Sequence, residues 1–213
     1  MSKASAANSP SVFTRDCTDS SAMIFNLPNS LTWLRILLIP LVVGVFYVPD
    51  TWLTPHGKNL TATIVFVFAA LTDWLDGYLA RQLNQTSAFG AFLDPVADKL
   101  MVAAALIVLV ELGRAEAWVA CVIIGREIAI SALREWMAKV GAVRGVAVNM
   151  LGKFKTLAQM IAIPLLLYAD PLHALFPTLV IGTWLVYAAA VLTLVSMVYY
   201  LKAAFAPADK ANP

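Results

Sequence analysis

Apolar residues run through this sequence in six long segments that polar residues separate. The segments span residues 31–48, 60–81, 94–113, 116–139, 151–169 and 177–203. Each has close to the ~20 residues that an α-helix needs to cross the hydrocarbon core of a bilayer. The alternating pattern of about ten residues that is typical of a membrane β-strand is absent. The pattern therefore predicts an all-α integral membrane protein built as a bundle of six transmembrane helices.

The two ends of the chain are polar and lie outside this predicted bundle. Residues 1–20 lack the basic head and apolar run of a signal peptide, so we expect a flexible cytoplasmic tail. The membrane domain is expected at 21–205 and a cytoplasmic C-terminal tail at 206–213. A short interfacial segment precedes the first long helix, for which Asn29 or Ser30 is the expected N-cap. Aromatic residues near helix ends, including Tyr199 and Tyr200, are expected to be interfacial anchors.

The composition agrees with a membrane protein and excludes other classes. Hydrophobic residues make up 61% of the 213 residues and charged residues 13%, whereas soluble domains are about a quarter charged. The mean hydropathy is +0.78. The net charge of +2 comes without a basic block, so we expect no nucleic-acid partner. The two cysteines, Cys17 and Cys121, are too few for a disulfide scaffold.

The basic residues predict the orientation in the membrane. Twelve of the 15 lie in the tails, in the second and fourth connections or at nearby helix ends, whereas Lys58 and Arg114 lie on the opposite side. Arg126 lies within the fourth predicted helix. Because basic residues gather in cytoplasmic connections, we expect both termini and the connections at 82–93 and 140–150 in the cytoplasm.

Four aspartates interrupt the second and third apolar segments. Asp73 and Asp76 share one face of a helix, and Asp94 and Asp98 are spaced i and i+4. Asp94 is followed by a proline, which predicts an N-cap at the start of the third helix. Since the connection between these helices is short, the two pairs of carboxylates should face each other near the cytoplasmic end.

Carboxylates this close together need cations to offset their repulsion. Each would also cost about 2.5–3.5 kcal/mol at the centre of a bilayer. Two divalent ions would neutralise four aspartates, and ligands that are all oxygen favour Mg²⁺ or Mn²⁺. Gly77 and Ala80 lie beside the acids and leave room for a ligand near the helix backbone. The sequence therefore predicts a two-metal site that binds phosphate oxygens.

The spacing Asp73-x2-Asp76-Gly77-x2-Ala80-Arg81-x8-Gly90-x3-Asp94-x3-Asp98 resembles the signature of the CDP-alcohol phosphatidyltransferases at every fixed position. The resemblance implies an enzyme that transfers a phosphatidyl group from a CDP-linked donor to an alcohol and releases CMP. It implies that the four aspartates hold two metal ions against the diphosphate of CDP-diacylglycerol. It assigns Asp98 as the general base on the acceptor hydroxyl, with ligation of metal as the alternative role. Residues implied to bind CDP-diacylglycerol are Gly77, Ala80, Arg81, Asn29 and Thr32.

The fourth and fifth apolar segments carry an unusual number of charges. Glu127, Ser131 and Arg134 lie on one stripe of a helix, and basic groups beside a metal site indicate an anionic acceptor. Arg126 lies too deep to reach water easily and needs an anionic partner. Its neighbour Glu127 points about 100° away along a helix, which makes direct pairing awkward.

Three strings of residues resemble one branch of the family, the phosphatidylglycerophosphate synthases. They are Asn29-x2-Thr32-x2-Arg35, Arg126-Glu127-x3-Ser131-x-Leu133-Arg134 and Gly152-Lys153-x-Lys155-Thr156-x2-Gln159. That branch uses sn-glycerol 3-phosphate, so the resemblance implies this acceptor. The residues expected to bind it are Arg126, Arg134, Lys153 and Lys155. The resemblance also implies a homodimer in contact with membrane lipids, in the bacterial cytoplasmic (inner) membrane, with its active site facing the cytoplasm.

Two alternatives remain open. A sister enzyme would use another acceptor, such as serine, inositol phosphate or phosphatidylglycerol. A cation transporter would use the aspartates as its ion site, but transporters place such acids at mid-membrane in broken helices or inverted repeats. Here the acids lie near one interface and no internal repeat is visible.

Overall fold

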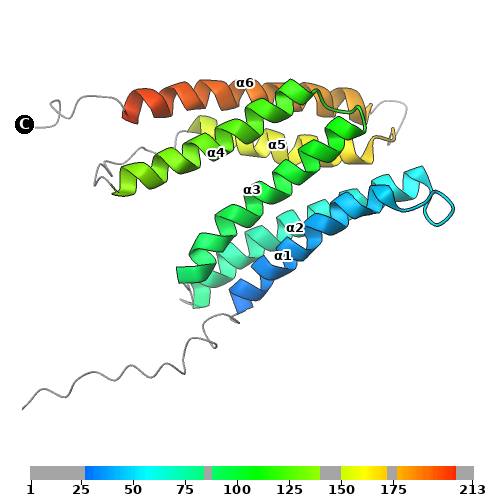
Figure 1. Cartoon of the computed structure of the whole chain (residues 1–213), viewed down its shortest axis with the longest axis horizontal. Helices are drawn as coiled ribbons and strands as arrows, with labels where there is room; N and C mark the ends of the chain where they lie inside the picture. Colours follow the sequence, from blue (N-terminus) through cyan, green and yellow to red (C-terminus); the bar gives the residue numbers. More distant parts are fainter. Residues whose placement is uncertain (1–26, 84–87, 140–149, 172–176, 205–213) are drawn as a thin grey trace, which may run out of the picture.

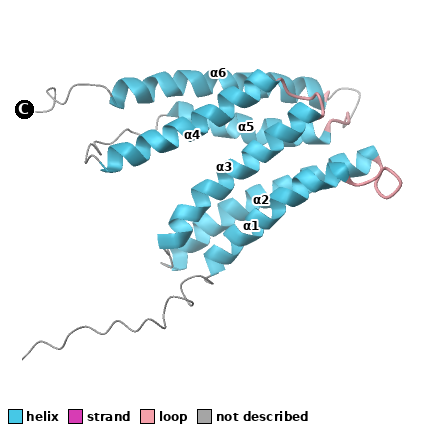
Figure 2. Ribbon diagram, in the orientation of Figure 1, coloured by secondary structure: helices cyan, strands magenta, loops and turns pink. Residues whose placement is uncertain are grey.

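The computed structural model describes residues 27–83, 88–139, 150–171 and 177–204, without the side chains of 27–29, 74, 76–83, 88–89, 91, 138, 150–153 and 203–204. These ranges hold six α-helices, a 3-10 turn and no strand (Figure 2). The elements are α1 (Leu27–Gly44), η1 (Val45–Tyr47), α2 (Pro55–Leu83), α3 (Ala88–Glu111), α4 (Ala117–Lys139), α5 (Met150–Tyr168) and α6 (Thr178–Ala204). The predicted all-α class is confirmed.

Three of the helices, α1, α2 and α3, begin at least four residues earlier than the apolar pattern predicts. Helix α2 begins at Pro55, where Thr54 caps it by accepting a hydrogen bond from the backbone N–H of Gly57 at 3.1 Å. Proline suits this first position because its missing N–H would have no partner inside the helix. The first turn of α2 therefore consists of polar residues that the hydropathy pattern could not assign to a helix.

The predicted N-caps of α1 and α3 are wrong. Helix α3 begins at Ala88, so Asp94 and Pro95 lie inside it. Pro95 lacks the N–H that would bond to the carbonyl of Ala91, and the carboxylate of Asp94 accepts a hydrogen bond from Thr32 of α1 instead of capping its own helix. In α1, Asn29 also lies within the helix, which begins at Leu27.

The helices pack in two groups, which are joined by α3 and by the contact between α2 and α5. Helix α1 packs against α2 and α3, α4 packs against α3 and α6, and α5 packs against α2 and α6. Figure 1 shows α3 crossing between the α1–α2 pair and the group of α4, α5 and α6. The start of α1 and the end of α6 lie toward the same end of the bundle, as an even number of alternating helices requires.

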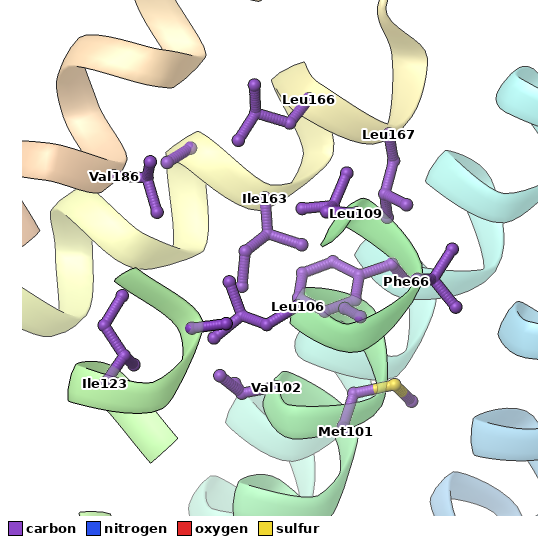
Figure 3. Packing of buried hydrophobic residues seen from close by; sticks show 14 of the residues in the cluster. Phe66, Met101, Val102, Leu106, Leu109, Ile123, Ile163, Leu166, Leu167 and Val186 are labelled. Carbon is purple, nitrogen blue, oxygen red and sulfur yellow. The ribbon is translucent and has the colours of Figure 1, made fainter. Parts of the chain in front are cut away.

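A continuous apolar core lies between the helices, and each of the six described helices contributes at least one buried side chain to it. Figure 3 shows Phe66 of α2, Leu106 of α3 and Ile163 of α5 directed toward one another, with Ile123 of α4 and Val186 of α6 nearby. These side chains are at most 1% exposed. The core fixes α3 relative to the other helices and so positions the polar residues that α3 carries.

The close contact between α5 and α6 depends on one glycine. A Cβ atom added at Gly182 of α6 would lie 2.8 Å from Cγ of Leu166 in α5. Real side chains do not approach this closely, so α6 can lie against α5 only because residue 182 has no side chain.

Two helices among the described residues are long and apolar enough to cross a membrane. The two apolar segments are Ser30–Tyr47, which runs through α1 and η1, and Thr178–Lys202 of α6, with mean hydropathies of 1.8 and 2.1. The prediction of six spans with both termini in the cytoplasm goes beyond this finding and is taken up below.

Candidate active site

The predicted acidic site lies where α1, α2 and α3 meet. Asp73 of α2 and Asp98 of α3 line the same small cavity, so these two helices do present acids toward each other. Asp76 lies in α2, but its side chain is outside the described residues. Among the side chains that are described, no three acidic, histidine or cysteine residues are grouped closely enough to hold a metal ion.

Helix α1 supplies a partner for two of the acids. Nη1 of Arg35 lies 2.5 Å from Oδ1 of Asp73, and the Arg35 side chain is only 1% exposed. The hydroxyl of Thr32, one turn earlier, donates a hydrogen bond to Asp94. This contact places Thr32, which the sequence assigned to the donor substrate, directly beside the acidic site.

Arg35 is a residue of this site that the sequence analysis did not assign. Its guanidinium offsets the charge of Asp73, and its burial requires such an anionic partner. The available signal was an arginine within an apolar segment. The sequence analysis used Arg35 to predict orientation and as part of the string Asn29-x2-Thr32-x2-Arg35, without giving it a role in the site.

A larger cavity of about 590 Å³ opens on the other side of Asp98. Residues from α3, α4, α5 and α6 line it. The charged ones are Asp98, Lys99, Arg126, Glu127, Arg134 and Lys155. With four basic and two acidic side chains, the wall carries a formal excess of two positive charges. The cavity therefore favours an anion of about that charge.

Arg126 is the most deeply buried arginine of this cavity, with 8% of its surface exposed. Its Nη2 donates to Oγ of Ser196 at 2.8 Å. Its Nη1 lies 3.5 Å from Oε1 of Glu127, so an ion pair between these sequence neighbours does form, although its distance is long. Its Nε is buried and has no hydrogen-bond partner among the described residues. Arg126 thus has one buried donor that the described protein groups leave without a partner.

Lys155 links α5 to α4 at the wall of the cavity. It is 4% exposed, and its ammonium group forms an ion pair with Glu127. Glu127 therefore serves mainly as the partner of Lys155. Lys155 is part of the buried site and does not extend to the membrane surface.

Arg134 lies at the exposed end of the same cavity, beside an aromatic ring. Its Nη2 donates to the hydroxyl of Tyr200 at 2.8 Å. Tyr200 is only 7% exposed and lines the cavity, so its prediction as an interfacial anchor is wrong. Tyr199 is 57% exposed, as an anchor would be. The sequence analysis could not separate two adjacent tyrosines because their difference is the helix face on which each lies.

Several predicted site residues lie outside the side chains that the structure describes. They are Asn29, Asp76, Gly77, Ala80, Arg81 and Lys153. Along their helices, Gly77 and Ala80 follow Asp73 in α2 and Lys153 precedes Lys155 in α5. Their roles stay predictions.

The described donors fit a hard divalent cation in chemistry. Asp73, Asp94 and Asp98 offer oxygen atoms alone, the ligands that Mg²⁺ and Mn²⁺ prefer. Asp73 faces the guanidinium of Arg35 and Asp94 the hydroxyl of Thr32. Each of these two carboxylates thus already faces a positively charged or hydrogen-donating group. A bound cation would present the same sign of charge to these carboxylates.

Comparison with known proteins gives a consistent result. Residues 25–195 match the family described as CDP-alcohol phosphatidyltransferase. Curated relatives named CDP-diacylglycerol–glycerol-3-phosphate 3-phosphatidyltransferase occur in Shigella flexneri serotype 5b, Shigella boydii serotype 4 and Escherichia coli K12. Each is 49% identical to this chain over 185 residues, which cover 85% of this chain and 96% of the relative.

The matched stretch contains the acids of α2 and α3, the contacts from α1 and most of the residues that line the larger cavity. The match covers most of the sequence and agrees with the spacing of the aspartates, and on these grounds the chain belongs to the CDP-alcohol phosphatidyltransferase family.

Proposed function

We propose that this chain transfers the phosphatidyl group of CDP-diacylglycerol to sn-glycerol 3-phosphate and releases CMP. The product, phosphatidylglycerophosphate, makes this the committed step of phosphatidylglycerol synthesis. The observation that carries the choice of acceptor is the larger cavity, with its formal excess of two positive charges and a buried Nε on Arg126 that has no partner within the described part of the chain. The relatives that bear this activity in their name support the same choice.

The acceptor phosphate binds in the larger cavity. A phosphate monoester carries close to two negative charges at neutral pH, which matches the excess on the wall. The guanidinium groups of Arg126 and Arg134 donate to its oxygens in the planar geometry that suits phosphate. Lys155 adds a third positive group, and Lys153 is expected to join it near the entrance.

Asp98 connects the two halves of the reaction. It lines both the small cavity that Asp73 faces and the larger cavity that holds the arginines. An acceptor with its phosphate on the arginines can direct a hydroxyl toward Asp98, which accepts the proton as that oxygen attacks the donor phosphorus. The bond between this phosphorus and CMP breaks in the same transfer, so no covalent enzyme intermediate is needed.

Asp73, Asp76, Asp94 and Asp98 would hold two divalent ions, Mg²⁺ or Mn²⁺. When bound, such ions neutralise the charge of the donor diphosphate. Gly77, Ala80 and Arg81 bind the CDP moiety, together with Asn29 and Thr32 of α1. The contact between Thr32 and Asp94 supports this placement because it brings α1 to the acids.

All six helices cross the bacterial inner membrane, with both termini and the active site at the cytoplasmic face. Large apolar side chains are exposed on every helix, including Leu37, Ile64 and Trp184, which suits contact with lipid. The functional unit is a homodimer.

Cysteine labelling tests the proposed topology. In a chain whose native cysteines are replaced, Lys58→Cys should react with maleimide added from outside the membrane. Labelling of Lys202→Cys from the outside would contradict this topology.

The direct test is CMP release by the purified chain in detergent with Mg²⁺. We expect release only when CDP-diacylglycerol and sn-glycerol 3-phosphate are both present, with phosphatidylglycerophosphate identified by mass spectrometry. Free glycerol, which lacks the phosphate, is the matched control and should give little release. Equal rates with glycerol and glycerol 3-phosphate would overturn the assignment of the cavity.

A further inference from the structure

Two arginines of the larger cavity meet on one tyrosine ring of α6. The guanidinium carbons of Arg126 and Arg134 lie 5.6 Å and 5.0 Å from the centre of the Tyr200 ring. Both distances are within the range of a cation–π interaction, about 6 Å. The Tyr200 hydroxyl also accepts the hydrogen bond from Arg134. One side chain therefore contacts both groups that the proposed function assigns to the acceptor phosphate.

A serine one turn earlier on α6, Ser196, holds Arg126 in place through a hydrogen bond. Ser196 is 1% exposed, and its hydroxyl donates to the backbone carbonyl of Thr193 at 2.9 Å. Because its only hydrogen is used there, its oxygen is left as an acceptor for Nη2 of Arg126, at 2.8 Å. Ser196 and Tyr200 are spaced i and i+4, so both lie on the face of α6 that is directed toward α4.

These contacts matter because two like charges must be held near each other before the ligand arrives. Arg134 is an exposed residue, and a free arginine side chain there would sample many rotamers and move away from Arg126. Ordering such a side chain on binding lowers affinity, whereas ordering it beforehand raises affinity. The contacts with Tyr200 and Ser196 provide that prior order.

We propose that Ser196 and Tyr200 are positioning residues that hold Arg126 and Arg134 in place for the acceptor phosphate. Neither residue acts on the reacting atoms. This proposal rests on the proposed function, since it assumes that the cavity binds a phosphate monoester. It makes α6 a determinant of acceptor affinity, although α6 carries none of the signature aspartates.

The test compares Tyr200→Phe, Tyr200→Leu and Ser196→Ala in the full chain, with Tyr199→Phe as the matched control. Tyr199 is the adjacent, exposed tyrosine of the same helix. For each purified variant, kcat and the KM of both substrates are measured with Mg²⁺ present. The inhibition constant of inorganic phosphate against glycerol 3-phosphate and the unfolding temperature in detergent complete the set.

We expect Tyr200→Phe to raise the KM for glycerol 3-phosphate about tenfold, since it removes a hydrogen bond to a charged group. The inhibition constant of phosphate should rise in parallel, while the KM for CDP-diacylglycerol and the unfolding temperature stay unchanged. Tyr200→Leu should have a larger effect because it removes the ring from both arginines. Ser196→Ala should raise the KM for glycerol 3-phosphate to a similar extent. If the Tyr200 variants do not fold, the result for Ser196→Ala tests the positioning role. Tyr199→Phe should match the wild type.

Two results would overturn the proposal. One is a KM for glycerol 3-phosphate within twofold of the wild type in both Tyr200→Phe and Ser196→Ala. The other is an equal rise in both KM values, which would indicate a general structural role. The wild type separates this proposal from the one on which it rests. A wild type without release dependent on glycerol 3-phosphate refutes both, whereas an active wild type with silent variants refutes the positioning role alone.

Discussion

At the scale of single residues, the site consists of charges held on two sides of Asp98. On one side, Arg35 of α1 contacts Asp73 at 2.5 Å. On the other side, the larger cavity carries more basic than acidic groups. Asp98 thus lies between the acidic side, where we propose that cations bind, and a cavity whose charge favours an anion. This is the arrangement that a transfer between a metal-bound diphosphate and a phosphorylated alcohol requires.

Replacement of Asp98 by Asn keeps the shape of the side chain but removes its ability to accept a proton. We expect the turnover of Asp98→Asn to fall by about 10²-fold or more, the usual effect of losing a general base. Binding of CDP-diacylglycerol should fall less. Steady-state kinetics with both substrates measures the two effects. Full recovery of the rate in excess Mg²⁺ would show that Asp98 acts as a metal ligand and not as the base.

Replacement of Arg126 by Ala removes the buried donor from the larger cavity. Hydrogen bonds to charged groups contribute about 1.5–3 kcal/mol, so the KM for glycerol 3-phosphate should rise by about one to two orders of magnitude. The KM for CDP-diacylglycerol should change much less. Lys153→Ala is expected to act in the same direction.

Two controls accompany this prediction. Lys139 is exposed at the end of α4 and pairs with Glu135 at 2.9 Å, so Lys139→Ala should leave both KM values unchanged. Arg144→Ala, in a connection outside the described residues, should also have little effect. An equal loss of affinity for both substrates in Arg126→Ala would contradict the assignment of the cavity to the acceptor.

At the scale of elements, the apolar pattern predicted the helices well and their first turns poorly. All six segments correspond to a helix, but α2 and α3 extend back to Pro55 and Ala88. These turns are held by a cap at Thr54 and by local hydrogen bonds, which do not depend on hydropathy. Asp94 was misassigned as a cap because an aspartate before a proline is typical of a helix start. In the folded chain that carboxylate accepts a hydrogen bond from the hydroxyl of Thr32, on a different helix.

Substitution of Gly182 tests the contact between α5 and α6. In Gly182→Ala the new Cβ would meet Leu166 at 2.8 Å, and overpacking of this kind typically costs about 1–3 kcal/mol. The unfolding temperature in detergent should fall. Gly44→Ala is the matched control, because a Cβ there has no neighbour within 4 Å and alanine favours a helix. If both variants unfold at the wild-type temperature, α6 does not lie against α5 as described.

At the scale of the whole molecule, the sequence predicted the all-α class and the family, and it assigned residues to both the acidic site and the larger cavity. The spacing of the aspartates identified the acids because they are close in sequence and lie on two consecutive helices. The contacts that α6 makes with the basic residues could not be predicted in the same way. Arg126 is separated by 70 or more residues from Ser196 and Tyr200, and its contacts with them depend on how α4 packs against α6. The sequence of one chain contains no pattern that reports such a contact.

The acidic site leads to a prediction about metal removal. Without cations the carboxylates repel one another, and the one ion pair with Arg35 that the structure describes, at Asp73, does not neutralise the other acids. We expect EDTA to abolish CMP release and Mg²⁺ or Mn²⁺ to restore it, whereas Zn²⁺ and Ca²⁺ should restore less because of their different coordination preferences. Substantial release with all divalent ions chelated would contradict the two-metal proposal.

The most direct test of the account is an acceptor panel with CDP-diacylglycerol and the purified wild-type chain. The panel contains sn-glycerol 3-phosphate, glycerol, serine, inositol phosphate and phosphatidylglycerol, and the quantity measured is kcat/KM from the rate of CMP release. The account predicts the highest kcat/KM for sn-glycerol 3-phosphate, because its phosphate matches the charge of the cavity between α3, α4, α5 and α6. A higher kcat/KM for an acceptor without a phosphate, such as serine, would contradict it.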